Sequence, residues 1–169
     1  NNASVFMVLL AVYNVLLSRY SGQGDIVVGT IAAAREHRDV EHMVGNFINT
    51  LPLRNFPAGE LSFENFLAAV KQSALEAFQH QSYPFGDLLD RLNVKKDLSR
   101  TPLFDVMFIM QNYDMPELEM GDCRLSPYVP AGDDENPVES RGIHVQHDLM
   151  LWCFETPAGL DFRLEYCTA

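Results

Sequence analysis

Five histidines are the residues of this sequence best suited to acid–base or metal chemistry. His144 and His147 are three residues apart on a segment with strand character, so we expect their side chains on opposite faces of it. His37 and His42 fall in a polar loop, and His80 lies near the end of a predicted helix, where it would complement the helix dipole. The spacing therefore predicts structural or solvated histidines and no metal site.

The other residues with reactive side chains also lack the patterns of a catalytic centre. Cys123, Cys153 and Cys167 show no C-x-x-C spacing, so we interpret them as thiols of a reducing compartment. The sequence contains no G-x-S-x-G, P-loop, G-x-G-x-x-G or H-E-x-x-H motif. No serine, cysteine or lysine has a recognisable activating neighbour. The residues by themselves predict no self-sufficient catalytic centre.

Polar residues embedded in apolar strands are the remaining candidates for a site. Thr30 ends the apolar run 26–29, and Asn46, Asn49 and Thr50 interrupt another such run. Buried amides must be hydrogen-bonded. These side chains therefore either satisfy neighbouring backbone groups or line a tunnel and orient a polar substrate, and the sequence leaves both alternatives open.

The stretch Leu103–Met110 organises the elements that would position these residues. It holds one charge, Asp105, among seven apolar residues. Such a run is too short for a good helix and too continuous for a half-exposed strand, so it predicts a central strand covered on both faces. Gln111 and Asn112 follow it, where a buried strand meets a polar cavity or solvent.

Helices are expected on both sides of this strand in the sequence. The first runs from Ser4 to about Tyr20, stops at Gly22 and is apolar on nearly its whole circumference, which predicts burial on most sides. The second begins at Ser62 with an apolar stripe at helical spacing, and a short third helix follows Pro84.

Further strands complete the expected sheet. They are predicted at Asp25–Ile31 and Val44–Arg54, where Pro52 indicates an edge or a bulge. After the central strand we expect two acidic loops, at residues 114–122 and 133–139, with a short strand at 124–129 between them. A hairpin is expected to follow, with strands at 145–155 and 160–167. This mixture predicts the α+β class, with a helix-backed, mixed sheet.

Length and charge limit the classes of function. A chain of 169 residues suits one domain, and a net charge of -11 disfavours binding to nucleic acid or to an anionic membrane surface. The apolar segment Ala3–Leu17 is shorter than the ~20 residues of a membrane span. Because Asn1 directly precedes an apolar helix, we expect the sequence to be a piece of a longer protein.

Five stretches together resemble the later motifs of nonribosomal peptide synthetase condensation domains. Order and spacing agree over nearly the whole chain. The stretches are Tyr20-Ser-Gly-Gln-Gly-Asp-Ile-Val-Val-Gly-Thr30, Val44-Gly-Asn-Phe-Ile-Asn-Thr-Leu-Pro-Leu-Arg54, His80-Gln-Ser-Tyr-Pro-Phe-Gly-Asp-Leu-Leu-Asp90, Lys96-Lys-Asp-Leu-Ser-Arg-Thr-Pro-Leu-Phe-Asp-Val-Met-Phe-Ile-Met-Gln-Asn112 and His147-Asp-Leu. Pro52 and His147, where an aromatic residue is expected, depart locally from the family pattern.

The resemblance implies half of a chloramphenicol acetyltransferase-like fold, with residues 1–169 as a C-terminal subdomain that is incomplete at both ends. In the family, two such halves enclose a tunnel. The phosphopantetheine arms of peptidyl carrier proteins enter it, and the acceptor amine attacks the donor thioester to form a peptide bond. The family's His-His-x-x-x-Asp-Gly motif belongs to the other half and is absent here, so no catalytic residue transfers to this chain.

By motif match, the chain would contribute one wall of the tunnel. Thr30 and Asn49 would lie nearest the reaction centre, with Gln111 and Asn112 further along. The implied partners are the N-terminal half of the domain, carrier proteins and an adjacent adenylation domain, in the cytoplasm, and the chain itself would bind no cofactor.

Two alternatives to a peptide-bond-forming half stay open at this point. One is part of an epimerization domain, although the Asn-Thr-Leu-Pro-Leu-Arg stretch fits that function less well. The other is a non-catalytic module that only docks carrier proteins. The residues upstream of this chain would discriminate, because a degraded histidine motif there would favour docking.

Overall fold

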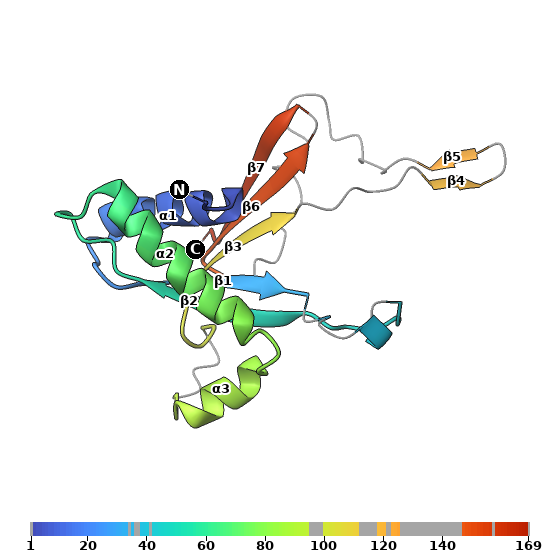
Figure 1. The fold of residues 1–169 in the computed structure, drawn as a ribbon, viewed down its shortest axis with the longest axis horizontal. Coiled ribbons are helices and arrows are strands. Elements are labelled where there is room, and N and C mark those ends of the chain that lie inside the picture. Colours follow the sequence, from blue (N-terminus) through green and yellow to red (C-terminus); the bar gives the residue numbers. More distant parts are fainter. Residues whose placement is uncertain are drawn as a thin grey trace.

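The structure is a computed structural model that describes residues 2–33, 35, 38–40, 42–94, 100–111, 118–120, 123–125, 147–156 and 158–168. Its elements follow the expected mixture of helices and strands (Figure 1). In chain order they are α1 (Val5–Ser21), β1 (Ile26–Ala32), the 3₁₀ turn η1 (Arg38–Val40), β2 (Asn49–Asn55), α2 (Phe63–Gln79), α3 (Phe85–Arg91), β3 (Val106–Gln111), β4 (Leu118–Met120), β5 (Cys123–Leu125), β6 (Leu149–Thr156) and β7 (Gly159–Tyr166).

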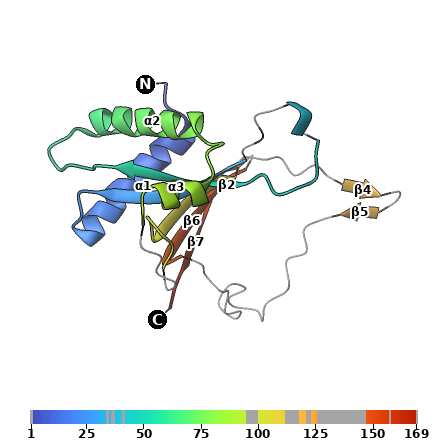
Figure 2. The same cartoon turned by 90° about the horizontal axis from the view of Figure 1, so that it is seen from below.

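The main sheet has five strands in the order β2-β1-β3-β6-β7. Strand β3 lies in the middle and runs parallel to β1 and β6, while β2 and β7 pair antiparallel at the two edges. The prediction of a mixed sheet around this central strand is confirmed. The carboxyl ends of β1, β3 and β6 therefore lie at the same end of the sheet, and η1 and the strands β4 and β5 lie beyond that end (Figures 1 and 2).

Helix α1 begins and ends where the sequence places its caps. The Met7 N–H donates to the Ser4 hydroxyl at 3.3 Å. At the other end, Gly22 has a left-handed φ of 71° and its N–H donates to the Ser18 carbonyl at 2.9 Å. The prediction that this helix is buried on most sides is wrong for one stripe of it. The sheet and α2 cover the other sides, but Val5, Val12 and Leu16 are about half exposed.

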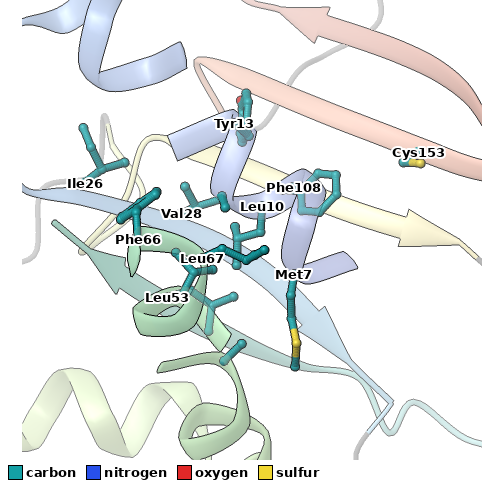
Figure 3. Packing of buried hydrophobic residues seen from close by; sticks show 13 residues of the cluster. Met7, Leu10, Tyr13, Ile26, Val28, Leu53, Phe66, Leu67, Phe108 and Cys153 are labelled. Carbon is teal, nitrogen blue, oxygen red and sulfur yellow. The ribbon is translucent and has the colours of Figure 1, made fainter. Parts of the chain in front are cut away.

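The main core lies between the sheet and the layer formed by α1 and α2. Leu10 of α1, Val70 of α2, and Val28 and Phe108 of the strands are fully buried there. Figure 3 shows how side chains from both helices and from the strands meet in this cluster. Helix α2 starts at the predicted cap, where the Asn65 N–H donates to the Ser62 hydroxyl at 3.3 Å.

A smaller core covers the opposite face of the sheet. Phe104, Met107 and Ile109 are buried in it, and Phe85 of α3 packs against Phe104 with ring centroids 5.8 Å apart. Leu103 has a φ of 75°, which is unusual for a bulky side chain and follows Pro102 in a turn that leads to Phe104. The central strand is thus covered on both faces, as predicted.

Several predicted boundaries are wrong. Residues 44–48 are not strand, because β2 begins at Asn49, and the acidic segment 114–122 contains the short strand β4. The strand expected at 124–129 is observed at Cys123–Leu125. The hairpin is confirmed as β6 and β7, although His147 precedes β6 instead of lying on it. Residues 133–139 lie outside the described residues.

Candidate functional site

A cavity of about 280 Å³ lies where β1 and β3 end against the helices. Thr30 contributes to its wall and is only 1% exposed. Strand side chains alternate between faces, so Thr30 points to the same side of the sheet as Val28, toward the helices. The other walls come from α1, α2 and their neighbours, and include Phe6, Ala32, Phe78, Gln81 and Met110.

The side chain of Asn49 connects the start of β2 to the segment between α2 and α3. Its Nδ2 donates to the carbonyl oxygens of Gln81 at 2.8 Å and of Tyr83 at 2.7 Å. Its Oδ1 accepts a hydrogen bond from the Phe85 N–H at 3.2 Å. Both amide protons are therefore used within the chain, as in the alternative that embedded amides satisfy neighbouring backbone groups.

Thr30 and Asn49 lie in one neighbourhood of the fold. Asn49 pairs with Ala32 across the two strands, and Ala32 is two residues beyond Thr30. The segment that Asn49 holds includes Gln81, which lines the cavity together with Thr30. Asn49 thus supports the cavity wall through Gln81, while Thr30 contributes to that wall directly.

Gln111 lies apart from this pair. It is the last residue of β3, opposite Phe154, and alternation places it on the other face of the sheet from Met110, which lines the cavity. Asn112 lies outside the described residues. Of the four predicted site residues, the structure therefore brings Thr30 and Asn49 together. Gln111 lies at the same end of the strands but on the opposite face of the sheet.

No histidine in the described ranges lines this cavity. His42 and His80 are exposed, and His37 and His144 lie outside the described residues. His147 is near the start of β6, at the opposite end of the sheet, since the neighbouring Leu149 pairs with the first residue of β3.

His147 belongs to a small polar cluster at that opposite end. Its Nδ1 lies 3.1 Å from the Thr101 hydroxyl oxygen, and its ring centroid is 5.6 Å from that of Phe104. Partial burial lowers the pKa of His147, against the raising influence of the Asp105 and Asp148 charges. This imidazole is thus held neutral as part of the scaffold.

Two arginine–aspartate pairs lie at the same end of the sheet. Arg54 donates to both carboxylate oxygens of Asp25, at 2.9 and 2.7 Å, and this hydrogen bonding lowers the pKa of Asp25. Arg100 forms a similar fork with Asp105. Both pairs link a residue beside one strand end to a neighbouring segment and are far from the cavity in the sheet, so we interpret them as structural.

Among the residues that the structure describes, the other reactive groups do not gather into a second cluster. Cys153 is buried, and burial raises the pKa of its thiol, which leaves it a poor nucleophile. Within the described part of the chain no three acidic, histidine or cysteine side chains gather around a possible metal position. No described helix is long and apolar enough to cross a membrane.

Sequence reasoning missed the residues that shape the cavity. Phe6 and Phe78 belong to apolar helix patterns that also occur in ordinary cores, and nothing in the sequence separates a cavity wall from a filled core. It also missed Arg35, whose guanidinium contacts the loop between β1 and β2. An isolated arginine in a polar loop carries no signal of such a role.

The arrangement is suited to orienting a substrate and lacks a group to move protons. It places Thr30 in the wall of the cavity, and a fully bonded amide, that of Asn49, holds part of that wall in position. A hydroxyl can donate to a developing oxyanion or accept from an amine. None of the described residues that line the cavity carries an acidic or basic side chain.

Comparison with known proteins places the fold and the motifs in one family. The family model of the condensation domain matches residues 1–169. Tyrocidine synthase 3 of Brevibacillus parabrevis is 50% identical over 165 residues, and gramicidin S synthase 2 of Brevibacillus brevis is 44% identical over 165 residues. Both matches cover 98% of this chain, but only 2% and 4% of those relatives.

A solved structure shows the same fold. A four-domain nonribosomal peptide synthetase bound to AMP and glycine superposes with a TM-score of 0.79 at 21% identity. The match covers 96% of this chain and 13% of that one. The chain therefore corresponds to a small part of much longer proteins.

Proposed function

The chain belongs to the condensation domain family, and from this premise we propose that residues 1–169 form the C-terminal half of a domain that makes peptide bonds in a nonribosomal peptide synthetase. The substrates would be aminoacyl and peptidyl thioesters on the phosphopantetheine arms of peptidyl carrier proteins. The other partners would be the N-terminal half of the domain and an adjacent adenylation domain. A cytoplasmic location is part of this proposal.

The position of the histidines is the observation that supports the proposal that this chain is only half of a condensation domain. The three described histidines lie outside the cavity that contains Thr30, and the sequence has no two adjacent histidines. A condensation reaction needs a group that handles the proton of the attacking amine. This group would come from the other half of the domain, so the chain alone would be inactive.

In the proposed reaction the acceptor amine attacks the carbonyl carbon of the donor thioester. A C–N bond forms, the C–S bond breaks, and the thiol of the donor arm leaves. The Thr30 hydroxyl would orient the amine or the developing oxyanion, and Asn49 would act through the segment that it holds. Gln111 and Asn112 would lie further along the tunnel wall.

The proposal is tested by supplying the missing half. The preceding segment of the parent synthetase and residues 1–169 are produced separately, and dipeptidyl transfer between cognate loaded carrier proteins is measured for each alone and for the mixture. We expect transfer only from the mixture. Transfer by residues 1–169 alone would refute the proposal, as would no transfer by an assembled pair.

Variants of the intact domain test the role of Thr30. Thr30→Val removes the hydroxyl at nearly constant shape and is expected to lower the transfer rate by about tenfold, the order of a lost oriented hydrogen bond. Thr30→Ser keeps the hydroxyl and should retain more activity. Thr50→Val, on the opposite face of β2, is the matched control.

A further inference from the structure

The loop between β1 and β2 is organised around one side chain, that of Arg35. Its Nη1 donates to the carbonyl oxygens of Val40, at 2.5 Å, and of Met43, at 2.9 Å, and its Nη2 donates to that of Gly45 at 3.5 Å. The guanidinium carbon also lies 4.3 Å from the centroid of the Phe47 ring. One cation thus contacts four positions along the loop.

None of the described side chains of this loop, at residues 33, 35, 38–40 and 42–48, is fully buried. Met43, Val44 and Ile48 are 53%, 103% and 62% exposed. An exposed segment with little apolar contact is expected to open easily unless polar contacts fix it. The bonds from Arg35 supply such contacts, because they tie the carbonyl group at the end of η1 to those of Met43 and Gly45, which lie outside the helices and the sheet.

The chemistry of the guanidinium matches this arrangement. Its planar fork carries five N–H donors, and its flat face can stack on an aromatic ring at the same time. A lysine ammonium has the same charge but cannot reach three separate carbonyl groups and cover a ring as a plane. The contacts of Arg35 therefore depend on shape as well as on charge.

The loop leads from the cavity wall to the residue that supports it. It leaves β1 just after Ala32 and Ala33, which line the cavity, and it returns at Asn49. A hydrogen bond of 3.1 Å from the Ile48 N–H to the Asn46 side chain shapes the return. The loop thus leads directly into the first residue of β2, whose amide bonds to residues 81, 83 and 85.

We propose that Arg35 is a positioning residue that fixes the β1–β2 loop as a rigid rim of the Thr30 cavity, and that peptide transfer depends on this rim. The inference rests on the proposed function of the chain. It assigns to Arg35 no contact with the substrate. Its effect is exerted through the loop and through Asn49.

The test uses the intact synthetase module that contains this chain, with Arg35→Gln, Arg35→Lys and the control Arg38→Gln. Arg38 is an exposed arginine of the same loop that makes none of these four contacts. Cleavage by thermolysin before Val44 reports opening of the loop. Dipeptidyl transfer with varied acceptor carrier protein separates kcat from KM.

For both Arg35 variants we expect cleavage about tenfold faster than in the unmodified module, because proteolysis follows the population of the opened loop. We expect kcat to fall by about tenfold with KM for the carrier protein within about twofold, since misplacement affects the chemical step. Arg38→Gln should match the unmodified module in both assays.

Other results overturn the inference. Unchanged cleavage in Arg35→Gln would show that Arg35 does not fix the loop, and faster cleavage with unchanged transfer would show that transfer does not need the rim. If Arg35→Lys behaved like the unmodified module in both assays, or if Arg38→Gln had the same effects as Arg35→Gln, positive charge alone would explain the results and the specific contacts of Arg35 would not matter. Phe47→Leu, which removes only the stacked ring, gives an independent variant and should show a smaller change in the same direction.

The outcome is separable from that of the proposed function. If the unmodified module transfers no peptide, the proposed function fails, while cleavage still decides whether Arg35 holds the loop. If the unmodified module is active and the Arg35 variants equal it in both assays, only the inference about Arg35 fails.

Discussion

At the scale of single residues, buried polar atoms divide into those that are bonded and those that are not. The amide of Asn49 has three backbone partners. By contrast, the Tyr13 hydroxyl and the Asn14 Oδ1 are buried without a hydrogen-bond partner among the described residues. Such atoms lose their hydration on folding and gain nothing in exchange, so they are sites where substitution should help stability.

Replacement of Tyr13 by phenylalanine tests this expectation. At pH 7, Tyr13→Phe should raise the free energy of unfolding by about 0.5–1.5 kcal/mol, because it removes a buried hydroxyl without a partner. Urea unfolding of the intact condensation domain measures this change. A clear loss of stability would show that the hydroxyl has a partner.

The same variant should alter the response to alkaline pH. Burial raises the pKa of Tyr13 from 10.0 to about 12, so this hydroxyl ionises at a lower pH in the unfolded chain than in the folded one. Stability is therefore lost as the pH rises from 10.0 to about 12. Tyr13→Phe should lose less stability between pH 9 and 11. Tyr20→Phe, at an exposed position, is the control.

His147 should make stability fall on the acid side of neutrality. Its pKa in the folded state is lowered from 6.5, mainly by burial, so the stabilisation is present above that value and is lost as pH falls through the folded pKa. His147→Phe should make the unfolding free energy change less between pH 7.5 and 5.5. An unchanged pH profile would contradict the lowered pKa.

At the scale of elements, the close approach of β1 to the loop before β3 depends on a glycine. A Cβ added to Gly29 would lie 2.3 Å from a ring carbon of Phe104, a buried side chain. The two elements can therefore pack only if position 29 has no side chain. This contact joins the first half of the chain to the central strand.

Gly29→Ala is expected to destabilise the domain by about 1–3 kcal/mol, the usual cost of overpacking a core. Thermal or urea unfolding measures the loss. Gly24→Ala is the matched control, because no atom lies within 4 Å of the position that its new methyl group would take. Adding Phe104→Leu should recover part of the loss in a double-mutant cycle, and the absence of any coupling would refute the contact.

Asn49 joins β2 to the connection between α2 and α3, and its substitution should loosen that connection. Asn49→Ala leaves the carbonyls of Gln81 and Tyr83 without their donor, at a cost of about 1–3 kcal/mol. Amide hydrogen exchange at Phe85 should become faster, since its N–H loses its acceptor. Exchange at the level of the unmodified domain would contradict the bracing role.

At the scale of the whole molecule, the isolated chain leaves apolar surface uncovered. The β7 side chains Leu160, Phe162, Leu164 and Tyr166 are 39–60% exposed. They lie on the helix side of the sheet, because Phe162 pairs with the buried Cys153. Large exposed apolar surfaces promote association.

We therefore expect residues 1–169, produced alone, to associate as concentration rises. Sedimentation velocity over a range of concentrations measures this, and Phe162→Lys with Leu164→Lys should shift the distribution toward monomer. Asp161→Lys, on the opposite face of the same strand, is the control. A strictly monomeric chain at all concentrations would refute the expectation.

The sequence by itself determined the class of fold and the family. Local signals sufficed for α1 and α2, because Ser4, Gly22 and Ser62 act on their own turns. The buried central strand followed from an apolar run, and the predicted half of a chloramphenicol acetyltransferase-like fold agrees with the structural match. Both the burial of the central strand and the ends of the helices follow from patterns within a few neighbouring residues.

The tertiary structure alone decided what the polar residues do. Thr30 and Asn49 are 19 positions apart, and the pairing of β1 with β2 places Asn49 opposite Ala32, two residues beyond Thr30. Asn49 meets its acceptors more than 30 residues away, and Arg35 closes its loop through carbonyl groups that every residue carries. Backbone acceptors leave no trace in a sequence, so their partners become visible only when the chain is folded.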